Sequence, residues 1–170
     1  MGRTLGTATV ESKGGRTDPH MIKTDVLTPG QARAVSDLME TVTEHDSVAA
    51  LDEAARLQLK ASARRRGVWH LLEYSRERVL VGYASILSDG TVQGMVHPEH
   101  RHQGHGTALL TRAMTLTPNP AVWVHGADSD TSSFLRSHGF KSTRELVTMS
   151  LELEPCAAEH TVPDLSLIHI

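Results

Sequence analysis

The stretch VHPEHRHQGHGTALL, residues 96–110, decides how this chain folds. It leads from the end of an apolar strand, through a proline and several charged or imidazole side chains, into Gly-His-Gly and then an apolar helix pattern. Two glycines just before a helix allow three readings: a tight turn and nothing more, a cradle for phosphate, or a metal site built from histidines. The rest of the sequence is needed to choose among them.

Length and charge limit the class of protein. The chain has 170 residues, of which 39% are hydrophobic and 22% charged, as is typical of one globular domain. Its formal charge of −3 and its isoelectric point near 6.4 argue against a nucleic-acid partner. The one basic run, residues 64–66, is interpreted as a solvated helix end. Because no apolar stretch is long enough to span a bilayer, we expect no membrane partner.

The two ends of the sequence differ from its middle. Residues 1–20 are polar and glycine-rich and lack the apolar segment of a secretory signal, so we expect a disordered extension before a domain that opens at Met21. Cys156 lies in a segment with the composition of a linker, and a single cysteine cannot form an internal disulfide. This is compatible with the reducing cytoplasm, where we expect the protein to reside.

Segments of helical and strand periodicity alternate along the chain and predict an α/β domain. The expected order is a strand, two helices, three antiparallel strands, a helix, a strand, a helix and a strand. Thr28 to Gln31 predicts the capping box of the first helix. We expect the two tryptophans in the core, and Met114 buried with Leu109, Leu110 and Ala113. The other expected segments are a helix over 48–63, a helix over 106–116, a strand over 121–126 and a strand over 143–153.

The two glycines of the quoted stretch suit a phosphate group. The first N–H groups of a helix are unpaired and carry a partial positive charge, and Gly104 and Gly106 remove the Cβ atoms that would keep an anion away. Arg101 adds a cation. The spacing is neither Gly-x-x-x-x-Gly-Lys-Ser/Thr nor Gly-x-Gly-x-x-Gly, so a P-loop and a dinucleotide fold are unsupported. The glycines taken alone favour a simple turn into a helix.

The wider context resembles a known motif. Arg101-x-x-Gly104-x-Gly106, after the strand end in MVHPEH and before an apolar helix, is similar to the acetyl-CoA-binding motif of the GNAT acetyltransferase superfamily. The resemblance covers residues 21–153 and implies a GNAT fold, with a mixed central sheet of about six to seven strands flanked by four helices. It also implies a bulged strand whose open edge pairs with pantetheine. The acetyl-CoA-binding residues that it implies are Gly94, Met95, Val96, Arg101, His102, Gln103, Gly104, His105, Gly106 and Thr107.

Further residues narrow the resemblance. VHPEHRHQGHGTALL, the VWVHG strand and GFKSTRELVTMSLEL are similar to the N-terminal half of the mycothiol synthase family, whose members carry two tandem GNAT domains. That family transfers acetyl from acetyl-CoA to the cysteine amine of cysteinyl-glucosaminyl-inositol. The resemblance implies that residues 154–170 are a linker and the truncated start of a second GNAT domain, which is a missing partner.

Acetyl transfer to an amine needs a deprotonated amine, a polarised thioester carbonyl and a stabilised thiolate. The resemblance implies that a strand N–H near Val96 polarises the carbonyl. GNAT enzymes commonly take their acid from a tyrosine four residues before the closing glycine of the last helix. Counted back from Gly139, that position is Leu135, and the nearby Ser132 and Ser133 are poor acids. Since the C-terminal half of the mycothiol synthase family is thought to carry catalysis, we expect weak or no transferase activity from this half.

Four further residues are candidates for the acceptor site. Through the resemblance, Glu53 aligns with an acidic residue that contacts the sugar-inositol substrate, and a solvated helix face is the alternative. His125 ends the fifth strand and is the candidate catalytic base, because imidazole titrates near neutrality; a structural histidine is the alternative. Glu73 and Tyr83 lie on central strands, and either residue could line the acceptor pocket.

The histidines raise a metal alternative. Of 11 histidines, His97, His100, His102 and His105 lie in one loop. The cluster has no cysteine and no carboxylate partner on a regular element. If the loop wraps a pyrophosphate, the side chains of His102 and His105 point outward. We therefore predict no metal site.

Three functions remain open at this level. The first is an N-acetyltransferase of the mycothiol synthase type, present as its N-terminal half. The second is a free-standing GNAT enzyme for another small amine, which predicts turnover of acetyl-CoA by a single domain. The third is a non-enzymatic acetyl-CoA-binding module, which predicts binding without turnover.

Overall fold

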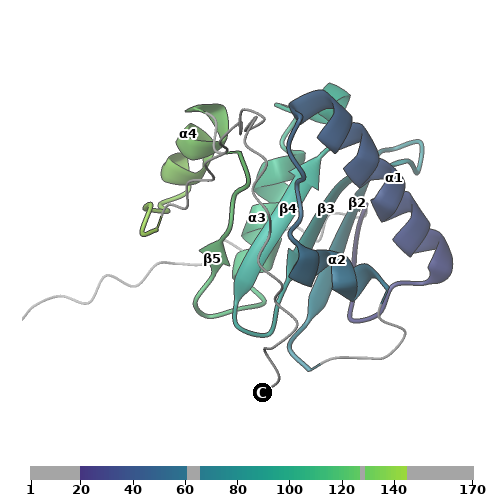
Figure 1. Cartoon of the computed structure of the whole chain (residues 1–170), viewed down its shortest axis with the longest axis horizontal. Coiled ribbons are helices and arrows are strands. Elements are labelled where there is room, and N and C mark those ends of the chain that lie inside the picture. Colours follow the sequence, from purple (N-terminus) through teal and green to yellow (C-terminus); the bar gives the residue numbers. More distant parts are fainter. Residues whose placement is uncertain (1–19, 61–65, 127–128, 145–170) are drawn as a thin grey trace, which may run out of the picture. The chain divides into compact units, whose positions relative to one another are not determined.

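The computed structural model describes residues 20–60, 66–126 and 129–144. The chain divides into two compact units, residues 1–132 and 133–170, and each is described by itself. The elements in chain order are β1 (Met21–Thr24), α1 (Pro29–Asp46), α2 (Glu53–Leu59), β2 (Trp69–Tyr74), β3 (Leu80–Ile86), β4 (Thr91–Val96), the 3₁₀ turn η1 (Pro98–His100), α3 (His105–Met114), β5 (Ala121–Val122) and α4 (Ser129–Ser137) (Figure 1).

The sheet is mixed. Its strands lie in the order β1-β2-β3-β4-β5, with antiparallel pairing among the first four strands and parallel pairing between β4 and β5. This confirms the expected α/β class and the mixed sheet. The described residues form five strands, where about six to seven were expected. Most of the expected strand over 143–153, and nearly all of the expected extension and linker, lie outside the described residues.

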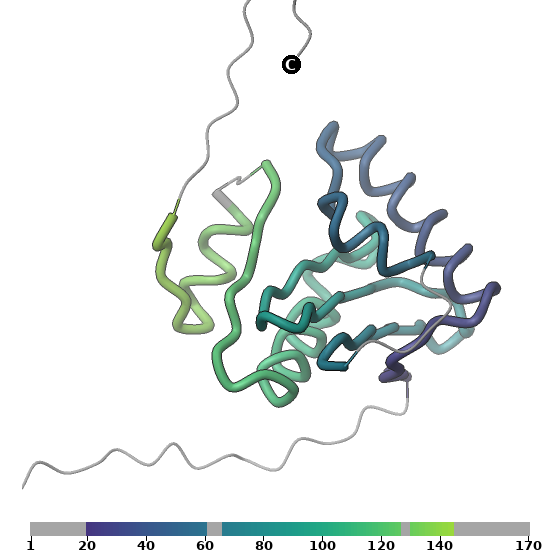
Figure 2. Tube along the Cα trace, turned by 60° about the horizontal axis from the view of Figure 1, so that its bottom comes forward, coloured from purple at the N-terminus to yellow at the C-terminus, as the bar shows by residue number. Residues whose placement is uncertain are grey.

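Helices cover both faces of the sheet. Figures 1 and 2 show α1 and α2 on one face and α3 on the other. Side chains alternate between the two faces along a strand, so Leu71 packs below α3 whereas Leu72 packs below α1 and α2. Each face therefore has its own apolar cluster. The buried residues of the α3 cluster are Leu71, Ala84, Ile86, Val92, Leu109 and Ala113.

The start of α1 follows the predicted capping box. The Thr28 hydroxyl accepts the Gln31 N–H at 3.2 Å, and the Gln31 side-chain oxygen accepts the Thr28 N–H at 2.9 Å. Pro29 occupies the first helical position, where its missing N–H costs nothing. The helix ends at Asp46, because Ser47 adopts a left-handed conformation with φ of 57°. The sequence therefore encodes this start locally.

The second helix is shorter than predicted. The expectation of a helix from residue 48 is wrong, since α2 begins at Glu53. Asp52 caps it by accepting the Ala55 N–H at 2.8 Å, and this ends the preceding loop. Leu51 is buried from the loop rather than from a helix face, whereas Val48 is exposed. Residues 61–65, which include most of the basic run, lie outside the described residues.

Later elements agree in position and differ in burial. α3 buries Leu109, Leu110 and Ala113 as predicted, but Met114 in its last turn is 43% exposed. β5 covers only residues 121–122, so Trp123 follows the strand and is half-buried rather than in the core. Trp69 on β2 is also half-buried, with the Lys23 ammonium 4.0 Å from its ring centroid. Trp69 therefore borders the α3 cluster, against which it packs.

The predicted end of α4 is confirmed. Gly139 has a φ of 85°, and the Phe140 N–H donates to the Leu135 carbonyl at 3.0 Å, which closes the helix with a left-handed glycine. Within the described parts of the chain, no helix has the length and apolar character needed to cross a membrane.

Candidate functional site

Strand β4 has a paired half and an open half. β3 pairs with β4 as far as Val96, but β5 pairs with it only at Thr91 and Val92. The Val92 carbonyl accepts the Trp123 N–H at 3.0 Å and so faces β5. Because alternate residues of a strand point their N–H and C=O groups the same way, those of Gly94 and Val96 face this side too. Among the described residues no strand pairs with that edge, and an extended chain with amide groups fits it.

The open edge does not arise from a bulge. The pairing of β3 with β4 runs without a shift from Gly82–Val96 to Ile86–Val92, so the implied bulge on β4 is wrong. The irregularity lies instead between Glu73 and Tyr74, in the pairing of β2 with β3. The edge is open because β5 ends early.

The quoted loop ends in an uncapped helix N-terminus. Gly104 has a φ of 92°, where a residue with Cβ is strained, and no atom lies within 4 Å of the position that a Cβ would take. The first helical hydrogen bond runs from the Ala108 N–H to the Gly104 carbonyl at 2.9 Å. The N–H groups of His105, Gly106 and Thr107 thus have no helical acceptor, and no side chain caps α3. This geometry suits a phosphate oxygen.

Two other predicted loop residues lie beside this N-terminus. His102 adopts a left-handed φ of 58° and is exposed. The side-chain amide of Gln103 donates to the Glu99 carbonyl at 3.0 Å and so holds the loop to the preceding turn. Their backbone N–H groups, rather than their side chains, remain the candidates for an anion.

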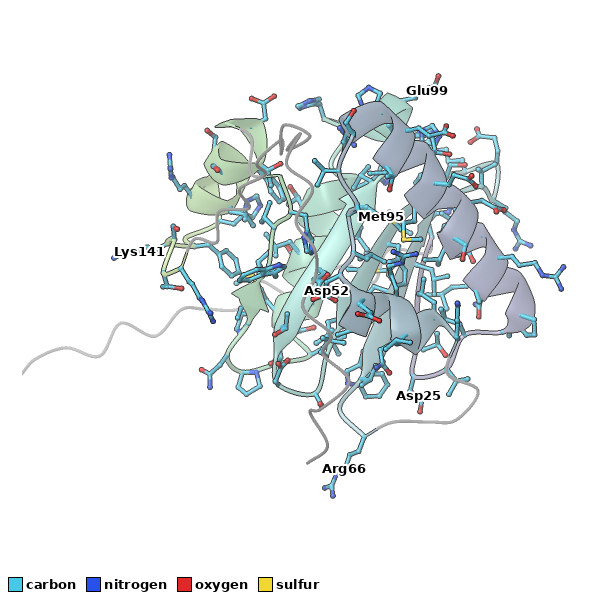
Figure 3. All side chains as sticks on the ribbon, in the orientation of Figure 1. Asp25, Asp52, Arg66, Met95, Glu99 and Lys141 are labelled. Carbon is cyan, nitrogen blue, oxygen red and sulfur yellow. The ribbon has the colours of Figure 1, made fainter. Side chains whose placement is uncertain are left out.

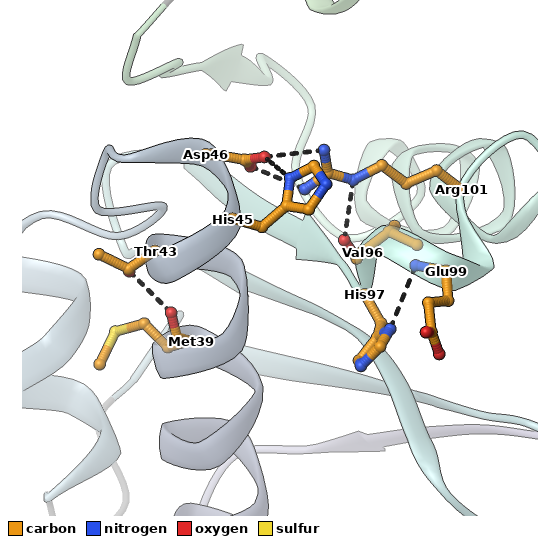
Figure 4. A network of polar contacts seen from close by, with 8 residues as sticks. All are labelled: Met39, Thr43, His45, Asp46, Val96, His97, Glu99 and Arg101. Carbon is orange, nitrogen blue, oxygen red and sulfur yellow. Dashed lines mark hydrogen bonds and ion pairs between the residues drawn. The ribbon is translucent and has the colours of Figure 1, made fainter.

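Arg101 is not a free cation. Its two terminal nitrogens donate to the two carboxylate oxygens of Asp46 at 2.9 and 2.7 Å, and its Nε donates to the Val96 carbonyl at 3.2 Å (Figure 4). Hydrogen bonding to Arg101 holds the pKa of the Asp46 carboxyl below its ordinary value. The sequence places Arg101 near the loop correctly, but it gives no sign of its partner on α1.

His105 points the opposite way to the prediction. Its Nδ1 lies 3.1 Å from Oε1 of Glu73 on β2, whose side chain is 2% exposed. The side chain of His105, at 21% exposure, therefore reaches inward below the first turn of α3 rather than outward. A buried carboxylate is costly unless it is hydrogen-bonded, so this contact links the loop to the sheet.

Glu73 and Tyr83 lie on opposite faces of the sheet. Glu73 belongs to the α3 face, whereas Tyr83 is in the α1/α2 cluster and donates or accepts a 2.7 Å hydrogen bond with Nδ1 of His70. Burial raises the pKa of the Tyr83 hydroxyl and lowers that of His70. Both proposed pocket residues are fully buried and already contact another side chain, Glu73 that of His105 and Tyr83 that of His70.

Gln93 is a residue that the sequence analysis missed. It is fully buried on β4, and its side-chain oxygen accepts the backbone N–H of Asp52 at 2.9 Å. Figure 3 shows Asp52 at the start of α2, in front of the sheet that also carries Met95. This hydrogen bond places the first residue of α2, the exposed Glu53, beside the middle of β4. A polar residue at an inward position of an apolar strand was the available signal.

His125 lies beyond β5 rather than on it. It follows the last strand residue, Val122, by three positions and stacks edge-on with Trp123 at 6.3 Å between ring centroids. Its Nε2 is buried and has no hydrogen-bond partner within the described residues. Such a nitrogen is able to accept or donate a proton when a suitable group arrives.

Leu135 and the loop histidines complete the predicted set. Leu135 lies on α4, four residues before the left-handed Gly139, as expected from the count. In the loop, the rings of His97 and His100 stand 5.4 Å apart, and those of His100 and His105 stand 6.2 Å apart. Within residues 20–60, 66–126 and 129–144, no three His, Cys, Asp or Glu side chains are grouped to hold a metal ion.

Solved structures share this fold. A GCN5-related N-acetyltransferase from Sphaerobacter thermophilus matches with a TM-score of 0.52 at 20% identity, over 73% of this chain and 44% of that one. A GNAT-family acetyltransferase from Streptococcus pneumoniae matches with a TM-score of 0.54 at 18% identity, over 78% of this chain and 98% of that one. An aminoglycoside N-acetyltransferase in complex with CoA matches with a TM-score of 0.51 at 11% identity, over 78% of this chain and 99% of that one.

Curated proteins share a higher sequence identity with this chain than these solved structures do. A protein named mycothiol acetyltransferase from Brachybacterium faecium is 39% identical, over 78% of this chain and 50% of the relative. Another of that name, from Streptomyces avermitilis, is 37% identical, over 81% of this chain and 46% of the relative. The chain thus spans about half the length of these relatives. The profile of the acetyltransferase (GNAT) family matches residues 34–140. The chain therefore belongs to the GNAT acetyltransferase family.

Proposed function

We propose that this chain is the acetyl-CoA-binding, N-terminal part of an N-acetyltransferase of the mycothiol synthase type. One observation carries the proposal: the open edge of β4 is followed, after the loop over residues 97–104, by the uncapped N-terminus of α3. The first feature suits an extended chain of amides and the second a pyrophosphate, and CoA contains both in sequence. The identity of 39% with a mycothiol acetyltransferase supports the choice of type.

The binding mode follows from these two features. The N–H groups of His105, Gly106 and Thr107 would donate hydrogen bonds to the pyrophosphate oxygens. The N–H groups of Gln103 and Gly104 lie beside them in the sequence and would add to this set. The N–H and carbonyl of Gly94 and the N–H of Val96 would pair with the pantetheine arm. Met95 points its side chain into the α1/α2 core, so it would contribute backbone only on the β3 side.

The proposed reaction is acetyl transfer to an amine. The ammonium first gives one proton to a base, and the neutral amine nitrogen then attacks the thioester carbonyl carbon. The C–S bond breaks, and the departing CoA thiolate takes up the second proton that the nitrogen loses. A backbone N–H on this open edge of β4, near Val96, would stabilise the oxyanion that forms on the carbonyl oxygen. His125, with its unpartnered Nε2, is the proposed base. Leu135 carries no ionisable group, which supports weak or no turnover by this part of the protein.

The proposed acceptor is the cysteine amine of cysteinyl-glucosaminyl-inositol. Its support is the family relationship together with Glu53, an exposed carboxylate that Gln93 and Asp52 hold beside β4. In this proposal residues 154–170 are a linker and the start of a second GNAT domain, and the rest of the enzyme, including that domain, completes the catalytic site. The full enzyme would act in the cytoplasm.

A calorimetric titration with acetyl-CoA tests the cofactor site. Wild type is compared with Gly104→Glu and with Gly139→Glu as a matched control. Both glycines are left-handed, at φ of 92° and 85°, and both have open space where a Cβ would lie, so a side chain should strain the backbone to a similar degree at each. We expect Gly104→Glu to weaken binding about 100-fold or more, because a carboxylate there repels phosphate, and Gly139→Glu to bind within about threefold of wild type.

Equal losses in both variants would contradict the phosphate cradle, as would binding by Gly104→Glu at the wild-type affinity. Thiol release in the presence of acetyl-CoA and small amines then separates the other functions. Turnover by this chain with an unrelated amine would favour a free-standing enzyme. Binding without turnover, even when the rest of the enzyme is supplied, would favour a non-enzymatic module.

A further inference from the structure

Arg101 connects three segments that are distant in sequence. Its guanidinium joins the loop after β4 to the carboxylate of Asp46, 55 positions earlier at the end of α1, and to the last carbonyl of β4 (Figure 4). The two contacts to Asp46, at 2.9 and 2.7 Å, form a bidentate pair, which fixes the plane of the guanidinium. We call Asp46, Arg101 and the Val96 carbonyl the clamp.

The clamp occupies part of the open edge of β4. The carbonyl of Val96 faces the same side as the groups of Gly94, because the two residues are two positions apart on one strand. Arg101 Nε donates to this carbonyl at 3.2 Å. The edge left for an incoming chain therefore ends at the Val96 N–H.

Asp46 stands where a carboxylate is unfavourable by itself. It is the last residue of α1, and the C-terminus of a helix carries partial negative charge. Two cationic or hydrogen-bonding partners offset this: Arg101, and Nδ1 of His45 at 2.8 Å. The side chains of Asp46 and Arg101 are 33% and 32% exposed, so the pair is only partly screened by water.

We infer that Asp46 is a positioning residue for the acetyl-CoA site: it holds Arg101 on the Val96 carbonyl and so fixes where the open edge ends. The inference rests on the proposed function and adds a role for Asp46 to it. Arg101 then acts through the clamp rather than as a free ligand of the pyrophosphate. The opposite arrangement, in which Asp46 competes with phosphate for Arg101, predicts a change in affinity of the opposite sign.

The test uses two ligands and three variants of the full chain. The ligands are acetyl-CoA and acetyl-pantetheine, which lacks the pyrophosphate. The variants are Asp46→Asn, Arg101→Lys and, as a matched control, Glu44→Gln, which removes one negative charge from an exposed position of the same helix. Dissociation constants come from calorimetry or competition, and hydrogen exchange of the Arg101 Nε–H is followed by NMR.

We expect Asp46→Asn to weaken both ligands by the same factor, about threefold to tenfold, because the clamp acts on the strand edge proposed to pair with the pantetheine arm that they share. Arg101→Lys should do the same, since an ammonium lacks the planar fork that pairs with both Asp46 oxygens and the separate Nε–H that reaches the Val96 carbonyl. Exchange of the Arg101 Nε–H should be slow in wild type with and without acetyl-CoA and fast in Asp46→Asn. Glu44→Gln should leave all of these values unchanged.

Two results would overturn the inference. Tighter binding of acetyl-CoA by Asp46→Asn, with acetyl-pantetheine unaffected, would show that Asp46 competes with phosphate. Unchanged affinity for both ligands would show that the clamp does not position the site. Failure of wild type to bind acetyl-CoA is a separate result, which overturns the proposed function and removes the basis of this inference with it.

Discussion

The two faces of the sheet bury polar groups in different ways. On the α1/α2 face, His70, Ser85 and Gln93 form a row across three strands, since His70 pairs with Ser85 and Ser85 with Gln93. All three are at most 2% exposed. The α3 face buries apolar side chains, and its buried carboxylate, Glu73, contacts His105 at the start of α3. Polar groups thus spread across one face and concentrate below the loop on the other.

This difference indicates how each face is held. α3 is fixed on its face of the sheet by apolar burial, and His105 adds a polar contact from its first turn to the sheet. α2, with Glu53 at its start, is tied to β4 by the directional bond between Gln93 and the Asp52 N–H. Substitutions on the two faces should therefore differ in what they change.

The largest effect is expected from a charge on the α3 face. Val92 is 3% exposed in the α3 cluster, so Val92→Asp buries an unpaired carboxylate and should lower the free energy of unfolding by about 4 kcal/mol or more. Urea denaturation followed by circular dichroism measures this. Thr91→Asp, at the partly exposed neighbouring position, is the control and should cost about 1 kcal/mol or less. Similar losses in both would mean that this face is not a dry core.

Removing the polar contact below the loop should have a smaller effect. His105→Ala deprives the buried Glu73 carboxylate of one partner and should lower the free energy of unfolding by about 2 kcal/mol. His102→Ala, an exposed residue of the same loop, should change it by less than about 0.5 kcal/mol. Thermal or urea unfolding of the two variants gives the comparison. Equal stability of the two would argue that the His105–Glu73 contact does not fix the loop.

On the α1/α2 face, the effect should be smaller and local. Gln93→Leu removes the acceptor of the Asp52 N–H and should lower the free energy of unfolding by about 1 kcal/mol, since Nε2 of Gln93 has no partner among the described residues to lose. Hydrogen exchange should quicken at the amides of α2 before those of α3. Uniform exchange across both helices would contradict a local tether.

The smallest effect is a pH dependence from His70. Burial lowers the pKa of His70 below its ordinary value of 6.5, so the unfolded chain binds a proton more readily than the folded one. Stability is therefore greatest above pH 6.5 and falls as the pH drops from 6.5 toward the folded-state pKa. His70→Gln should remove this contribution, so wild type should lose stability relative to the variant as the pH falls through that range, as measured by urea unfolding. A constant difference from pH 7.5 to 5 would contradict it.

Much of the fold could be predicted from local patterns. The capping box at Thr28, the strand periodicity of β2 to β4 and the left-handed glycines at Gly104 and Gly139 all depend on residues within a few positions of one another. Such features follow from hydrogen bonding and side-chain alternation over short stretches. The extents of α2 and β5 were predicted less well. The start of α2 is set by the Asp52 cap, and the length of β5 is set by its pairing with β4.

The sequence by itself determined the α/β class, the order of elements from β1 to α4 and the glycine loop before α3, because each is encoded by neighbouring residues. Only the tertiary structure decided which side chains meet. Arg101 contacts Asp46, which is 55 positions away in the sequence. The Asp52 N–H donates to Gln93, 41 positions away, and His105 contacts Glu73, 32 positions away. These contacts depend on strand register and helix placement, which bring distant residues together and which no short stretch of sequence contains.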